Sequence, residues 1–83
     1  MIKSDLLIFF IGKKIKHYRL TRGLSGNELG RMIGVSQQQI SRYENGVSTL
    51  SFYMLNKILK SFELDDSEIN IFFDEVKVYF YKH

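Results

Sequence analysis

The side chains best suited to chemistry lie in residues 36–43, where three consecutive glutamines are followed within a few positions by a serine and an arginine. Gln can form two hydrogen bonds with adenine and Arg can form two with guanine, so these groups recognise bases rather than make or break bonds. Four of them fall on one side of a helix, away from its apolar positions: Gln37, Gln38, Ser41 and Arg42. We expect them to contact base edges in the major groove of double-stranded DNA, although Arg42 could equally reach a phosphate. The alternative is a solvated helix face.

Catalytic and metal-binding patterns are absent from the sequence. The two histidines, His17 and His83, have no partner at metal or catalytic spacing, there is no Cys, and no Gly-rich phosphate loop occurs. We therefore expect no enzymatic activity and no cofactor, and no small-molecule ligand is evident.

Holding such a reading face in position requires two helices joined by a short turn. The pattern needs two apolar anchors, a small residue between them, a residue with positive φ, a buried turn residue and two inward positions on the second helix. The chain supplies all of these: Leu29, Ile33, Gly30, Gly34, Val35, Ile40 and Tyr43. Met32 extends the apolar stripe of the first helix. The alternative is a plain helical hairpin within a larger bundle.

Both helices of this pair begin with a capping sequence. Ser25 is followed by Glu28, and Ser36 by Gln39, so each Ser can accept from the backbone while the third-position side chain reaches back to the cap. Asn45 and Gly46 are expected to end the second helix.

Three further helices are expected around this pair. The first runs from residue 4 or 5 to residue 21, with Gly23 as its stop. The next spans 51–62, and its inward residues are Phe52, Leu55, Ile58 and Leu59. The last begins at a capping sequence, Asp65 to Glu68. Residues 76–81 alternate as a strand would, but the three- and four-residue apolar spacing of the segment favours a helix.

Charge is distributed unevenly along the chain of 83 residues. Residues 1–60 carry ten Lys and Arg against three Asp and Glu, whereas residues 61–83 carry two against six. The basic segment 1–60 could bind a polyanion, although two ordinary solvent-exposed faces would give the same distribution of charge. The polar and basic residues flanking the reading helix are candidates for contacts with the DNA backbone: Asn27, Arg31, Ser36, Asn45, Ser48, Lys13 and Lys16.

One internal ion pair is expected. Arg19 falls late in the first helix and Glu44 at the end of the reading helix. A half-buried bridge between them would fix the orientation of the reading helix more than it would add stability.

Residues 11–59 resemble the lambda-repressor-like, Xre-type helix-turn-helix family, with the resemblance carried by 24–30, 33–36 and 40–46. It implies an all-α, five-helix domain, sequence-specific DNA binding in transcription regulation, a dimer on a two-fold operator, and the Arg19–Glu44 bridge. Residues 36–44 further resemble the MrpJ-like group of small regulators encoded with fimbrial operons in enteric bacteria. Two positions depart from the family: Gly26 replaces a usual Gln, and Leu50 a usual Pro.

The two ends of the chain hold more apolar bulk than one small core can absorb. We expect a single domain over 1–83, with its core in 11–62 and a dimerisation helix in 65–83. The expected homodimer contacts are Phe72, Phe73, Val76, Tyr79 and Phe80. The alternative is that the N-terminal extension packs over the last helix within one monomer.

The apolar run 6–11 is too short for an export signal or a membrane span. We therefore expect a bacterial cytoplasmic protein located on the nucleoid, without membrane contact. The main rival to DNA binding is a protein-interaction module on the same fold, such as an antitoxin.

Overall fold

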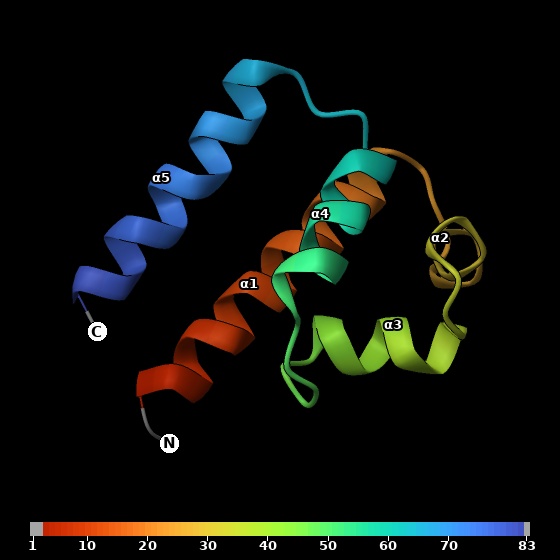
Figure 1. The fold of residues 1–83 in the computed structure, drawn as a ribbon, viewed down its shortest axis with the longest axis horizontal. Helices are drawn as coiled ribbons and strands as arrows, with labels where there is room; N and C mark the ends of the chain where they lie inside the picture. Colours follow the sequence, from red (N-terminus) through yellow and green to blue (C-terminus); the bar gives the residue numbers. More distant parts are fainter. Residues whose placement is uncertain (1–2, 83) are drawn as a thin grey trace.

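The computed structural model describes residues 3–82 and is all-α over this range (Figure 1). Its five helices are α1 (Lys3–Thr21), α2 (Gly26–Ile33), α3 (Gln37–Glu44), α4 (Phe52–Ser61) and α5 (Asp66–Lys82). Their number and order confirm the lambda-repressor-like architecture expected from the sequence. The described residues contain no strand, so the C-terminal segment is helical despite its alternating pattern.

Serine or aspartate caps set the starts of α2 to α5. The hydroxyls of Ser25, Ser36 and Ser51 each accept a hydrogen bond from the backbone N–H three residues later, at 3.0 Å. Asp65 does the same for α5, at 2.8 Å, while its own N–H donates to Glu68 at 3.2 Å. Each cap satisfies an N–H group that the helix itself leaves unpaired, which explains why the sequence located these starts correctly.

The core lies where α1, α2, α3, α4 and α5 converge. Its fully buried side chains are Ile15, Leu29, Ile40, Ile58, Phe62 and Phe72. Two expected core positions are wrong: Phe52 is 82% exposed and Met32 is 52% exposed. Phe62, which follows the last residue of α4, fills the core instead, because the helix presents Leu55, Ile58 and Leu59 inward and turns its first residue to the outside.

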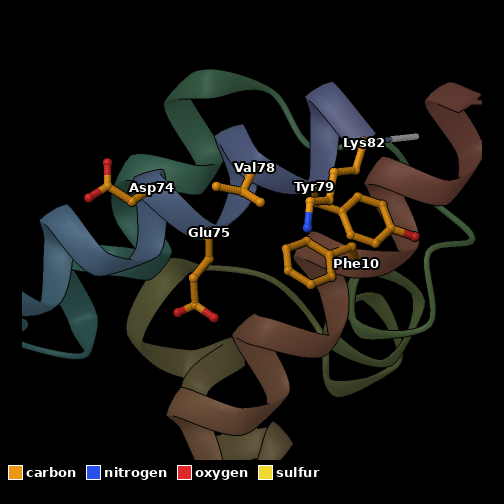
Figure 2. A pocket seen from close by; sticks show the side chains of 6 residues that line it. All are labelled: Phe10, Asp74, Glu75, Val78, Tyr79 and Lys82. Atoms are coloured by element: carbon orange, nitrogen blue, oxygen red, sulfur yellow. The ribbon is translucent and has the colours of Figure 1, made fainter.

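Helix α5 packs along α1, so the inward part of its apolar surface is covered within one chain. Figure 2 shows the rings of Phe10 and Tyr79 lying one over the other, at a centroid distance of 4.2 Å and an interplanar angle of 7°. Phe72 is fully buried, and Val76 is half-buried against the core. The expectation that Phe72 forms a dimer contact is therefore wrong, because its ring is already enclosed between the helices of its own chain.

Two ion pairs hold α5 in this position. Lys14 Nζ lies 2.9 Å from Glu75 Oε1. Arg22 Nη2 donates to both oxygens of Glu68, at 3.0 and 2.9 Å, while its Nε donates to the carbonyl of Phe62 at 3.0 Å. Arg22 therefore joins the ends of α1 and α4 to the start of α5. No helix in the described range is both long and apolar enough to cross a bilayer.

Candidate nucleic-acid interface

Helices α2 and α3 meet at a turn that only small residues permit. Gly34 adopts the left-handed conformation, with φ 81°, and its N–H donates to the carbonyl of Gly30 at 2.8 Å. A Cβ atom on Gly30 would lie 2.6 Å from the carbonyl oxygen of Val35, too close for any side chain. The glycine at position 30 thus lets the turn pack directly on α2, which sets the angle at which α3 leaves.

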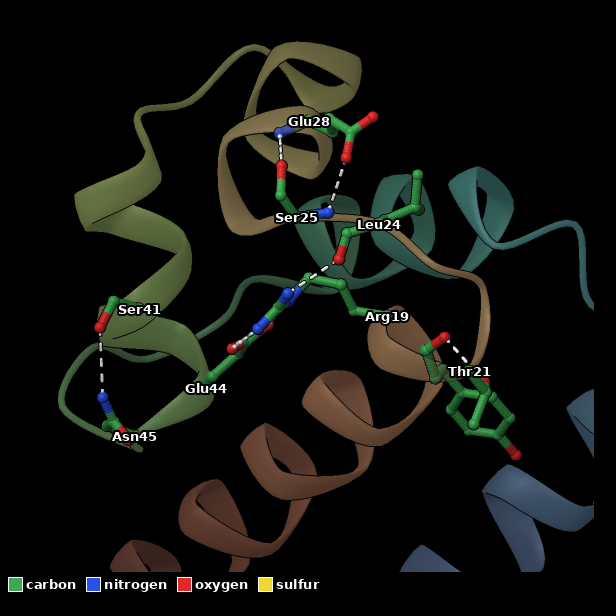
Figure 3. A network of polar contacts seen from close by, with 9 residues as sticks. Arg19, Thr21, Leu24, Ser25, Glu28, Ser41, Glu44 and Asn45 are labelled. Carbon is green, nitrogen blue, oxygen red and sulfur yellow. Dashed lines mark hydrogen bonds and ion pairs between the residues drawn. The ribbon is translucent and has the colours of Figure 1, made fainter.

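The cap of α3 differs from the one expected. Ser25 and Glu28 form a complete capping box at the start of α2, as Figure 3 shows. At α3, Ser36 accepts from the N–H of Gln39, but no returning bond from the Gln39 side chain is formed. The Gln39 side chain is therefore not committed to the cap.

A buried ion pair locks the end of α3 to α1. Arg19 Nε donates to Glu44 Oε2 at 2.7 Å and Arg19 Nη2 to Glu44 Oε1 at 3.1 Å, while Nη1 donates to the carbonyl of Leu24 at 2.8 Å (Figure 3). The hydrogen bond to Glu44 raises the pKa of Arg19 above its ordinary value. Glu44 is buried, and no buried side-chain polar atom among the described residues is without a partner.

The approach of α1 to α3 depends on Gly12, which the sequence analysis missed. A Cβ atom there would lie 2.7 Å from the carbonyl oxygen of Glu44 and would also overlap the carbonyl of Tyr43. Gly in the middle of a long helix is unfavourable by itself, and that is the signal that could have identified this contact.

The four expected base-reading residues, Gln37, Gln38, Ser41 and Arg42, are all exposed on α3. Gln38, Ser41 and Arg42 lie away from the buried Ile40, whereas Gln37 lies one turn before Ile40 and close to Gly26 of α2. Ser41 Oγ accepts from the side-chain amide of Asn45 at 3.2 Å, and Arg42 Nε donates to Ser48 Oγ at 2.9 Å. Helix α3 thus presents polar groups outward, while its inner side is fixed by the core and by Glu44.

The expected backbone-contact residues surround this face. Asn27, Arg31, Ser36 and Asn45 are exposed on α2 and at the two ends of α3, whereas Ser48 is half-buried. The exposed Lys13 lies 4.9 Å from the ring centroid of Phe9, and the backbone of Phe9 closely approaches Gly46 in the loop after α3. Lys16 is exposed one turn beyond Gly12, on the side of α1 that contacts α3.

Metal-binding clusters are not found in the part of the chain that the structure describes. His17 packs edge-on against Tyr18 at a centroid distance of 5.7 Å, and His83 lies outside the described residues.

Comparison of the sequence with known proteins identifies the family of the chain. A helix-turn-helix family model matches residues 15–69, well over half of the chain. Antitoxin PezA of Streptococcus pneumoniae is 39% identical over 59 residues, which cover 71% of this chain and 37% of the relative. Uncharacterised HTH-type transcriptional regulators of Rickettsia conorii and Sinorhizobium fredii are 37% and 32% identical over 65 residues, covering 78% of this chain and 50% and 46% of theirs. The chain thus spans half or less of the length of these relatives.

Proposed function

Because the chain belongs to the helix-turn-helix family of transcriptional regulators, we propose that it controls transcription by binding a specific DNA sequence through the outward face of α3. The observation that carries the proposal is the contrast between the two sides of this helix. Ile40 and Glu44 are buried, whereas Gln37 and Gln38 are exposed side by side at its start. The N-terminal residues of a recognition helix are those that meet base edges in the major groove.

The supporting charges also fit a DNA backbone. Arg42 is the single cation on α3, and Glu44, its single acid, is neutralised by Arg19. Lys13 and Lys16 add positive charge where α1 meets the end of α3. Lys13 and Lys16 would fix the register of the protein on the duplex, while Gln37 and Gln38 read sequence.

Selection of binding sites from random DNA tests this function, followed by affinity measurements on the selected site. We expect the double variant Gln37→Ala/Gln38→Ala to bind that site about 30-fold more weakly or worse, because it loses two bidentate contacts. Asn70→Ala, which removes an exposed amide from α5, is the matched control and should bind normally. Equal affinity of the double variant and the unmodified protein would show that α3 does not read bases.

We further propose that the protein binds its operator as a homodimer. Apolar side chains of α4 and α5 line a groove of about 640 Å³, here called the α4/α5 groove; its walls include Phe52, Tyr53, Leu59, Leu64, Ile69 and Phe73. Lys60 and Glu63 also line this groove, so each copy carries one charge of each sign that a second copy could pair. A two-fold dimer buries the same patch on both copies, which suits a two-fold operator.

The proposal for the regulated genes rests on the sequence of residues 36–44 alone. Residues 36–44 resemble those of small fimbrial-operon regulators, so we propose fimbrial and motility genes as the regulon, reached on the nucleoid in the bacterial cytoplasm. Chromatin immunoprecipitation should enrich promoters of such genes, and enrichment confined to other promoters would contradict this assignment.

The second candidate function is an antitoxin, favoured by the similarity to Antitoxin PezA. In that role the protein would bind a partner protein as well as DNA. Co-expression with the product of the adjacent gene provides the test: relief of a growth arrest caused by that product supports the antitoxin role, and growth unaffected by that product argues against it.

A further inference from the structure

Arg42 is held at both its backbone and its side chain by the loop that follows α3. Its carbonyl oxygen accepts from the N–H of Val47 at 2.9 Å and from that of Ser48 at 3.4 Å. Its Nε donates to the hydroxyl of Ser48 at 2.9 Å. The half-buried Ser48 therefore touches both ends of this arginine and restricts the rotation of the exposed side chain.

The hydrogen bond to Ser48 leaves the outer edge of the guanidinium available. An arginine has five N–H donors, and the bond from Nε uses one, so those on Nη1 and Nη2 remain for a ligand. Arg19 and Arg22 use their terminal nitrogens on Glu44 and Glu68, whereas Arg42 forms no ion pair with any described residue. A forked donor with one restrained edge matches the two acceptors that guanine presents in the major groove, O6 and N7.

We propose that Ser48 is a positioning residue that orients Arg42 toward a guanine in the operator. In this role Ser48 does not itself bind a phosphate. The inference rests on the proposed DNA-binding function. Gln38 and Arg42 are four residues apart and share one side of α3, so their Cα atoms are separated by about 6 Å along the helix. With base pairs roughly 3.4 Å apart, the guanine read by Arg42 lies about two base pairs from the base read by Gln38.

The test begins with selection of sites from random DNA by the unmodified protein and by Arg42→Ala. The position at which Arg42→Ala loses its preference for guanine identifies the base that Arg42 reads. Anisotropy titrations then compare the selected duplex with duplexes carrying adenine or 7-deazaguanine at that position, since 7-deazaguanine lacks the N7 acceptor but still pairs with cytosine.

We expect Ser48→Ala to reduce the discrimination between guanine and the two substitutes about tenfold, while discrimination at the position read by Gln38 is unchanged. Ser48→Thr keeps a hydroxyl and should restore the discrimination. Thr49→Ala, which removes the neighbouring exposed hydroxyl, should have no effect. Circular dichroism melting of each variant separates these effects from unfolding.

Two results would overturn the inference. If Ser48→Ala weakens binding to all sequences equally and lowers the salt dependence by about one phosphate contact, Ser48 binds the backbone directly. If Arg42→Ala selects the same guanines as the unmodified protein, Arg42 reads no base, although dependence on Gln37 and Gln38 would still support the proposed function. Failure to select any sequence would instead overturn the proposed function itself.

Discussion

At the scale of single residues, the four arginines share one chemistry but have different surroundings. Arg19 and Arg22 are paired with carboxylates, at 2.7 and 2.9 Å, and join helices together. Arg31 and Arg42 are exposed on α2 and α3, and neither forms an ion pair with a described residue. The charge that could meet DNA is therefore smaller than the composition of residues 1–60 indicates.

The Arg19–Glu44 pair yields a stability prediction. The side chains of Arg19 and Glu44 are only 12% and 6% exposed, so removing one partner leaves a charge buried without compensation. We expect Glu44→Leu to lower the free energy of unfolding by about 3 kcal/mol or more, and Arg19→Met/Glu44→Leu to regain much of that loss. Urea denaturation of both variants and of Arg19→Met completes a double-mutant cycle. Strictly additive losses would show that the two side chains are not energetically coupled.

At the scale of helices, the positions at which helices begin follow local sequence rules. The positions at which they end follow such rules less consistently. Ser25, Ser36 and Ser51 cap their helices as short sequence patterns predict. Helix α4, in contrast, is followed by Glu63 in the left-handed conformation, with φ 53°, where a glycine would be expected. The residue type at position 63 therefore does not predict this turn. A backbone hydrogen bond closes it, from the N–H of Glu63 to the carbonyl of Lys60 at 3.1 Å.

The attachment of α5 to α1 should depend on pH through Glu68. Hydrogen bonds from Arg22 and from the backbone of Asp65 hold the pKa of Glu68 below its ordinary value of 4.5. A carboxylate with a lowered pKa stabilises the fold above its ordinary pKa, and this contribution disappears as the pH falls through the lower, folded-state pKa. We therefore expect Glu68→Gln to be less stable than the unmodified protein at neutral pH and to lose less stability on acidification below pH 4.5.

Urea midpoints followed by circular dichroism across this pH range provide the measurement, and hydrogen exchange of α5 amides shows whether the loss is local. Asp74→Asn removes an exposed carboxylate of α5 outside the Arg22 network and serves as the control. Parallel pH profiles for Glu68→Gln and the unmodified protein would contradict the prediction.

At the scale of the whole molecule, α2 and α3 lie at one end of the longest axis and α5 at the other (Figure 1). The domain extends 34 × 29 × 21 Å. Half-sites on a two-fold operator are roughly 34 Å apart, a separation comparable to the length of one protomer. No residue of α3 lines the α4/α5 groove, so pairing through that groove would leave α3 free to meet DNA.

The dimer proposal makes a prediction about mass. Phe73 lines the α4/α5 groove and is 42% exposed, so Phe73→Asp places a charge in the proposed interface. We expect light scattering to give a dimer mass for the unmodified protein at micromolar concentration and a monomer mass for Phe73→Asp. Val78→Asp introduces the same charge at an exposed apolar position outside this groove and should remain dimeric. A monomer mass for the unmodified protein, unchanged by Phe73→Asp, would overturn the proposal.

The sequence by itself determined the helix-turn-helix, because its requirements are local. Caps at Ser25 and Ser36, a positive-φ glycine at Gly34 and a close-packing glycine at Gly30 each act within a few residues, so spacing alone identifies them. The same spacing placed the polar residues of α3 on one face and made them candidates for base contact.

Only the tertiary structure decided which side chains are buried or paired within one chain. Apolar periodicity could not distinguish the buried Phe72 from the exposed Phe73, or show that Phe52 points outward, because several sides of α4 and α5 are apolar and the packing of distant helices selects one. Gly12 and Arg22 likewise act on residues far away in the sequence. Whether Arg42 is available to DNA, and what restrains it, depends on a loop whose path the sequence does not specify.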